Sequence, residues 1–185
     1  MSPNKWKLLS SRDVSPHKWF PIEMRTYQLP NGKIVDDFSV TTLPDVAMII
    51  PVTKDGKIVL VRQFKPGFGD VIIEFPAGRI EKTHKDIEQT ALHELEEETG
   101  IKASAVEYFA TLAGFPTKAT EKVSCFLARN VEFNSKQNFD PNEDIEVIIF
   151  TPLELDLLIE NNEIQGSPTI AAWELAKKKF PELSR

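Results

Sequence analysis

The chain has 185 residues, a formal net charge of −6 and a single cysteine. This length suits one domain with a substantial core, and 41% hydrophobic with 27% charged residues is typical of a folded globular protein. The negative balance argues against a nucleic-acid partner, because phosphate-backbone binding needs clustered lysine and arginine. Cys125 lies in an apolar run, so we expect a buried thiol rather than a nucleophile.

Membrane and export signals are not evident in the sequence. The N-terminal residues carry lysines but no apolar stretch of signal-peptide length, and no later stretch approaches the length of a membrane span. We therefore expect a cytoplasmic protein with no membrane partner.

The first predicted element is a β-hairpin over residues 19–42. Two runs rich in β-branched and aromatic residues flank Asn31-Gly32, which supplies the positive φ angles of a tight turn. Residues 46–52 and 57–64 repeat this arrangement around Asp55-Gly56 and predict strands that are buried on both faces.

Further strands and helices are predicted in the rest of the chain. Pro76-Ala77-Gly78 predicts a break in the extended chain, and Gly100 predicts the left-handed end of a helix. The predicted strands cover residues 71–75, 106–113, 122–128 and 145–150, and the predicted helices cover residues 86–99, 152–161 and 167–180. This order favours an α+β fold with a mixed sheet covered by helices on both sides.

The first predicted helix carries carboxylates on its buried side. At about 100° per residue, Glu94 and Glu98 overlap the apolar stripe around Leu95, Glu97 lies beside it, and Glu96 is an ordinary surface residue. An acidic run is usually a solvated helix face, but like charges at this spacing repel and buried carboxylates need a cation. Oxygen ligands suit Mg²⁺ or Mn²⁺, so we expect a hard divalent metal.

Residues 94–101, ELEEETGI, resemble the second half of the Nudix box, and residues 74–81, EFPAGRIE, resemble the approach to that box in ADP-ribose pyrophosphatases. The resemblance implies a Nudix-like α/β/α sandwich. It also implies an N-terminal β-hairpin extension, residues 1–43, that forms a homodimer, followed by a Nudix hydrolase domain, residues 44–185.

The resemblance assigns roles to individual residues. Glu94 and Glu98 are implied to be catalytic, and Glu143 resembles the late glutamate that reaches the metals and the attacking water. Pro116 lies at the spacing typical of the ADP-ribose pyrophosphatase branch, and Glu121 matches a substrate-contacting glutamate. The implied metal ligands are the Ala77 carbonyl, Glu94, Glu97 and Glu98.

Three basic residues lie near strand ends that flank the box and are candidates for contacts with phosphate oxygens: Arg62, Lys65 and Arg79. A solvated surface position for each is an equally open interpretation.

The first half of the box departs from the family pattern. His84 occupies the position of a family glutamate, and we interpret it as an exposed loop residue. His93 replaces the arginine that orients the glutamates. Histidine is a weaker and pH-sensitive substitute for a permanently charged, forked donor.

The resemblance implies Mg²⁺- or Mn²⁺-dependent hydrolysis of the diphosphate bond of a nucleoside diphosphate sugar. ADP-ribose is the favoured substrate, with AMP and ribose 5-phosphate as products. Two alternatives stay open: a catalytically weak Nudix domain that binds a nucleotide sugar as a sensor or regulator, and an interaction module with an acidic helix.

Overall fold

The computed structural model describes residues 4–81, 83–139 and 141–184, and the chain divides into two compact units. The N-terminal unit comprises Met1–Pro44 and Ala113–Glu121, and the main unit comprises Asp45–Leu112 and Lys122–Arg185. In the part of the chain that the structure describes, none of the helices combines the length and the apolar composition of a membrane-spanning segment.

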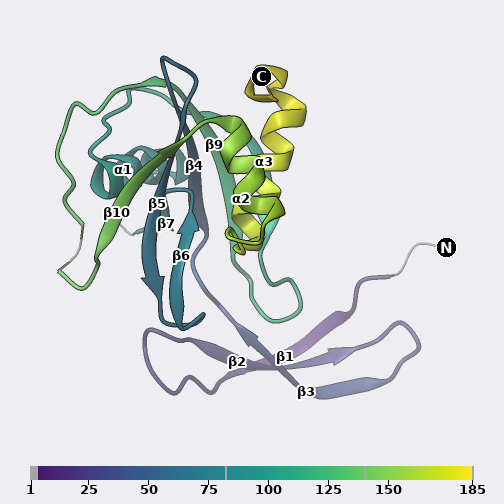
Figure 1. Ribbon diagram of the computed structural model, residues 1–185. Helices are drawn as coiled ribbons and strands as arrows, with labels where there is room; N and C mark the ends of the chain where they lie inside the picture. Colours follow the sequence, from purple (N-terminus) through teal and green to yellow (C-terminus); the bar gives the residue numbers. More distant parts are fainter. Residues whose placement is uncertain (1–3, 82, 140, 185) are drawn as a thin grey trace. The chain divides into compact units, whose positions relative to one another are not determined.

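The N-terminal unit contains an antiparallel sheet (Figure 1). Its strands, in spatial order, are β1 (Lys7–Asp13), β2 (Ile22–Gln28) and β3 (Ile34–Thr41). The predicted hairpin between β2 and β3 is confirmed, and Gly32 has the positive φ, 83°, that its turn requires. The sequence did not indicate β1, because every one of its residues is exposed and no apolar period marks it.

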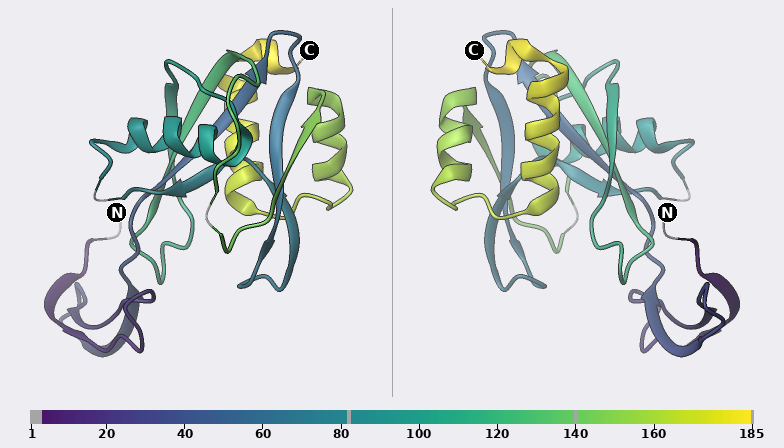
Figure 2. Two further views of the ribbon diagram at one scale, coloured as in Figure 1. Left: turned by 90° about the vertical axis from the view of Figure 1, so that its left-hand side faces the viewer. Right: turned by 90° about the vertical axis from the view of Figure 1, so that its right-hand side faces the viewer.

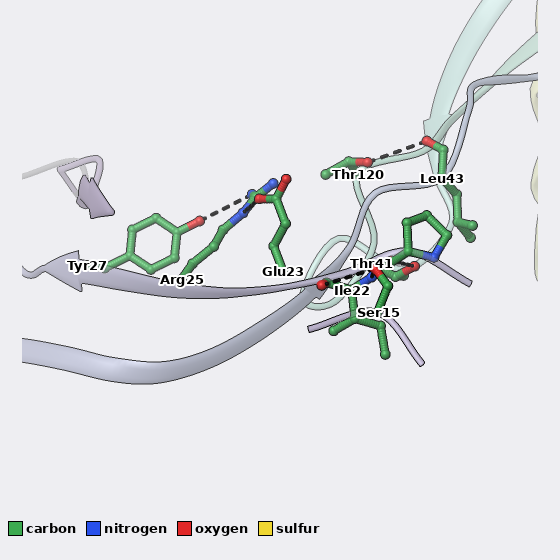
Figure 3. A network of polar contacts seen from close by, with 9 residues as sticks. Ser15, Ile22, Glu23, Arg25, Tyr27, Thr41, Leu43 and Thr120 are labelled. Carbon is green, nitrogen blue, oxygen red and sulfur yellow. Dashed lines mark hydrogen bonds and ion pairs between the residues drawn. The ribbon is translucent and has the colours of Figure 1, made fainter. Parts of the chain in front are cut away.

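Polar contacts connect the strands of the N-terminal unit to its loops (Figure 3). The Ser15 hydroxyl accepts a hydrogen bond from the Ile22 backbone N–H at 2.9 Å. The Thr120 hydroxyl donates to the Leu43 carbonyl at 3.4 Å. Through such contacts the segment Ala113–Glu121 belongs to this unit, although it lies outside the extension, residues 1–43, predicted from the sequence.

The main unit is built on a mixed sheet. Its elements in chain order are β4 (Val46–Thr53), β5 (Ile58–Lys65), β6 (Asp70–Glu74), β7 (Ala77–Arg79), α1 (Ile87–Thr99), β8 (Glu107–Ala113), β9 (Lys122–Val131), β10 (Ile145–Phe150), α2 (Pro152–Glu160), α3 (Ser167–Lys179) and the 3₁₀ helix η1 (Pro181–Ser184). The strand order is β10-β5-β4-β9-β8, with β6 paired to β5 and β7 paired to β4. Strands β4 and β9 are parallel, whereas β4 with β7 and β5 with β10 are antiparallel.

Alternate residues of β4 face two hydrophobic cores. Ala47 and Ile49 pack in the core that α1 covers, and Met48 and Ile50 pack in the core that α2 and α3 cover. The helices accordingly lie on opposite faces of the sheet (Figures 1 and 2). Full burial of each large aliphatic side chain contributes about 1.5–3 kcal/mol, so a strand buried on both faces anchors both helical layers. The predicted α/β/α sandwich is confirmed.

Cys125 lies on β9 in the core beneath α2 and α3 and is fully buried. Burial in these apolar surroundings raises the pKa of the thiol to about 12. The prediction of a core thiol is confirmed.

The ends of α1 follow the sequence signals. Asp86 caps the helix by accepting a hydrogen bond from the Gln89 backbone N–H at 2.8 Å, and Gly100 ends it with a φ of 72°. The break predicted around residues 76–78 is shorter than expected, because the chain pairs with β4 again at Ala77, opposite Met48. This short strand, β7, lies against α1, and its residues line the same cavity as the glutamates of that helix.

Candidate active site

A cavity of about 650 Å³ lies within the main unit, between β7, α1, the end of β5 and the loop before β10. It brings together most of the residues that the sequence singled out. The lining residues are Lys65, Ala77, Gly78, Arg79, Glu81, His93, Glu94, Glu97, Glu98 and Glu143.

Residues from the last two turns of helix α1 line this cavity. Glu98 is only 5% exposed, whereas Glu94 and Glu97 are half-buried. The Glu98 carboxylate accepts a hydrogen bond from the Ala77 backbone N–H at 3.1 Å, which joins α1 to β7. The burial of Glu98 agrees with the helix phase expected from the sequence.

Electrostatics make Glu98 an unusual carboxyl. Burial, together with the neighbouring charge of Glu94, raises the pKa of this carboxyl to about 8, although the Ala77 N–H and Lys65 act in the opposite direction. A buried carboxylate beside another carboxylate is costly unless a cation neutralises both. A cation bound in this cavity would therefore stabilise both carboxylates.

Gly78 permits the close approach of β7 to α1. A Cβ at this position would overlap the carboxylate of Glu94. The backbone of β7 therefore borders Glu94 directly, and any larger residue at this position would push the Glu94 carboxylate aside.

The residues present fit a divalent cation. Three carboxylates from one helix line the cavity, and the ligand atoms of His93, Glu94 and Glu97 lie within 4.8 Å of one another. Carboxylate and backbone carbonyl oxygens are the ligands of hard divalent ions.

Two of the three basic residues reach the cavity. Lys65 is held by an ion pair of 2.7 Å to Glu74, and Arg79 lines the cavity from β7. Arg62 instead forms an ion pair of 3.0 Å with Glu146 of the neighbouring strand β10.

Pro116 and Glu121 belong to the N-terminal unit, whereas the cavity lies in the main unit. Glu121 lines a separate, largely apolar hollow of about 430 Å³, together with Phe20 and Phe115.

The two histidines of the box lie together beside the carboxylates. His93 Nδ1 is 3.2 Å from Glu97 Oε2, and the ring centroids of His84 and His93 are 4.9 Å apart. His84 lies in the loop before α1 as expected, but it is half-buried, with Nδ1 3.0 Å from the Thr90 hydroxyl. The contact between the histidines could not be read from the sequence, because it depends on how that loop folds back onto α1.

Glu81 also lines the cavity, and the sequence reasoning gave it no role. It closes the segment 74–81 that resembles the approach to the Nudix box, which was the available signal.

The fold, the carboxylate helix and the family comparison agree. The NUDIX domain family model matches residues 42–172, so the chain belongs to the Nudix family. It is a Nudix hydrolase related to ADP-ribose pyrophosphatases, which places its chemistry at a diphosphate bond.

Several characterised proteins are similar to this chain. The ADP-ribose pyrophosphatase of Bacillus subtilis (strain 168) is 31% identical over 174 residues, covering 94% of this chain and 93% of the relative. The methanol dehydrogenase activator of Bacillus methanolicus is 29% identical, with 90% and 89% covered. The ADP-sugar pyrophosphatase of Mus musculus is 38% identical over 57% of this chain and 53% of its own.

A solved structure described as an ADP compounds hydrolase superposes with a TM-score of 0.83 at 20% identity, covering 98% of this chain and 97% of the other. This match shows the same fold.

Proposed function

We propose that this chain hydrolyses the diphosphate bond of a nucleoside diphosphate sugar, with ADP-ribose favoured, in a Mg²⁺-dependent reaction that yields AMP and ribose 5-phosphate. The observation that carries the proposal is one cavity in which three carboxylates of α1 face Lys65 and Arg79. The names of the B. subtilis and mouse relatives support the substrate class.

The residues that line the cavity have three roles in the proposed reaction. Lys65 and Arg79 bind the phosphate oxygens of the substrate, since an ion pair and a strand position hold them at the cavity. Glu143, from the loop before β10, orients the attacking water and accepts its proton. Glu94, Glu97, Glu98 and the Ala77 carbonyl hold the metal.

Mg²⁺, or Mn²⁺ in its place, supplies positive charge that stabilises the phosphoryl transfer. Glu98 must lose its proton to act as a ligand, and the charge it then carries completes the anionic cage. The Ala77 N–H holds one oxygen of this carboxylate, which fixes its orientation.

A substrate panel tests the proposal. ADP-ribose, other ADP-sugars, UDP- and GDP-sugars and the corresponding nucleoside triphosphates are incubated with Mg²⁺ and with excess phosphatase, and released phosphate is measured. We expect the highest kcat/KM for ADP-ribose. Absence of phosphate release from every diphosphate sugar would overturn the proposal.

We also propose a homodimer formed through the N-terminal unit. Large apolar side chains are exposed on this unit, among them Trp6, Leu8, Trp19 at 73% and Phe20. A small sheet with such a surface is marginal in water unless another layer covers it. Light scattering should give the mass of a dimer at micromolar concentration, and a monomer mass would exclude this arrangement.

A second candidate function is tight binding of a nucleotide sugar with slow hydrolysis, as in a sensor or regulator. His93 at the position of the family arginine favours it, and one relative carries the name of an activator. Binding of ADP-ribose in calorimetry together with turnover far below that of the B. subtilis relative would support this candidate over the first.

A further inference from the structure

One nitrogen ligand is placed among the carboxylates of the cavity. His93, Glu94 and Glu97 each offer one ligand atom, and these atoms lie within 4.8 Å of one another. Ligands held at about 2.1 Å from a common ion lie up to about 4.2 Å apart, so small side-chain rotations bring the three to one ion. All three residues lie on α1, where Glu97 follows Glu94 by three positions and His93 by four, and side chains at these spacings are neighbours on the helix surface.

The imidazole of His93 is oriented without a metal. Its Nδ1 lies 3.2 Å from Glu97 Oε2, and its ring packs beside the ring of His84 at 4.9 Å between centroids. His84 is itself fixed, since its Nδ1 accepts a hydrogen bond from the Glu81 backbone N–H at 3.3 Å and contacts Thr90. A ligand that neighbouring groups hold in this way loses little freedom on binding.

The chemistry of imidazole then determines which metal ion the site binds more tightly. Oxygen ligands suit Mg²⁺, whereas imidazole suits Zn²⁺ and Ni²⁺, and affinity at a given mixed site rises from Mn²⁺ through Co²⁺ to Ni²⁺. Replacing one oxygen position with nitrogen therefore strengthens the binding of these ions more than that of Mg²⁺.

We propose that His93 coordinates metal together with Glu94 and Glu97, so that this site binds Co²⁺, Ni²⁺ or Zn²⁺ through a nitrogen ligand in preference to Mg²⁺. The proposal rests on the divalent-metal centre of the proposed function and adds the ligand that sets its metal preference. Mg²⁺ binds the same cavity through the oxygen ligands alone.

Calorimetric titrations at one fixed pH test the proposal, because the chain has three histidines and each can be replaced singly. Co²⁺, Ni²⁺ and Mg²⁺ are titrated into the metal-free wild type and into His93→Gln, His84→Gln and His17→Gln. His93 is half exposed, so its replacement leaves the hydrophobic cores intact. His17, in the N-terminal unit, is the matched control.

We expect His93→Gln to weaken Co²⁺ and Ni²⁺ binding by at least about tenfold, while Mg²⁺ affinity stays within about threefold. His17→Gln should change neither, and the visible absorption of bound Co²⁺ should differ from wild type in His93→Gln but not in His17→Gln. Equal weakening of Co²⁺ and Mg²⁺ in His93→Gln would show that the histidine only orients Glu97, and no change would exclude it from the site. Either result would overturn this proposal. The proposed function is tested separately by ADP-ribose hydrolysis with Mg²⁺, so the failure of one can be distinguished from the failure of the other.

Discussion

The backbone N–H of Ala77 and the carboxylate of Glu98 are joined by a hydrogen bond of 3.1 Å. The bond connects a three-residue strand to the last turn of α1, and both residues line the cavity together with further carboxylates. It partly compensates the burial of Glu98, but it does not supply the charge that the cluster lacks, which is why the pKa of Glu98 remains raised to about 8.

The metal-free protein should lose stability as the pH rises through this range. The pKa of Glu98 is raised from 4.5 in its unperturbed form to about 8 in the folded chain. Between these values the unfolded chain has released a proton that the folded chain retains, so the free energy of unfolding falls from about pH 4.5 to about pH 8. Glu98→Gln removes this contribution, and its unfolding free energy should decline less over the same range.

Urea denaturation of both proteins at a series of pH values, with chelator present, measures this difference. Parallel pH profiles for wild type and Glu98→Gln would show that Glu98 is ionised already at low pH in the folded protein, which contradicts its raised pKa.

Gly78→Ala should impair the site. The new Cβ overlaps the Glu94 carboxylate and must displace it. Misplacing a catalytic group by about 1 Å can cost about 100-fold in rate, so we expect a loss of that order in kcat. Gly67→Ala is a matched control, because nothing lies within 4 Å of a Cβ at that position.

Steady-state kinetics of the two glycine variants with ADP-ribose and Mg²⁺ provide the measurement. Wild-type turnover in Gly78→Ala would mean that Glu94 moves aside without consequence and has no part in the reaction.

The sequence predicted the layers of the main unit well, because burial there follows simple periods. The β4 residues alternate between the two hydrophobic cores. The helical period of α1 alone is enough to predict that Glu98 lies on the buried side of the helix, and Glu98 is indeed buried. The short strand β7 was not expected, since its pairing with β4 overrides the local tendency of Pro76 and Gly78 to end a strand.

The positions of the basic residues depended on contacts that no local pattern reveals. Arg62 and Lys65 lie on the same strand, yet Arg62 pairs with Glu146 while Lys65 pairs with Glu74 and reaches the cavity. The pairing of β5 with both β10 and β6 determines which of these two basic residues reaches the cavity. This pairing is a property of the whole sheet and is not encoded by the neighbouring residues in the sequence. Membership of Pro116 and Glu121 in the N-terminal unit was likewise set by long-range contacts such as that of Thr120 with Leu43.

His93→Arg should change the metal preference of the reaction. Arginine provides a permanently charged fork that holds Glu97 or Glu94 but cannot bind a metal. Turnover with Mg²⁺ at neutral pH should rise by a few-fold to about 100-fold, while turnover with Co²⁺ should fall. The ratio of the two rates in wild type and variant is the quantity to measure, and an unchanged ratio would contradict a ligand role for His93.

We expect the carboxylates of α1 that line the cavity, and not the acidic helix in general, to carry the hydrolysis. Two nearby glutamates of α1 distinguish these two possibilities. Glu98 is buried and lines the cavity. Glu96 lies on another side of the helix, where it accepts a hydrogen bond from Ser135 and forms an ion pair with Lys102. The most direct measurement is kcat for ADP-ribose with saturating Mg²⁺ in Glu98→Gln and Glu96→Gln, both checked for folding by thermal unfolding. We expect Glu98→Gln to lose about 100-fold or more and Glu96→Gln to stay within about twofold of wild type. Equal rates in the two variants, with both proteins folded, would contradict this assignment of the active site.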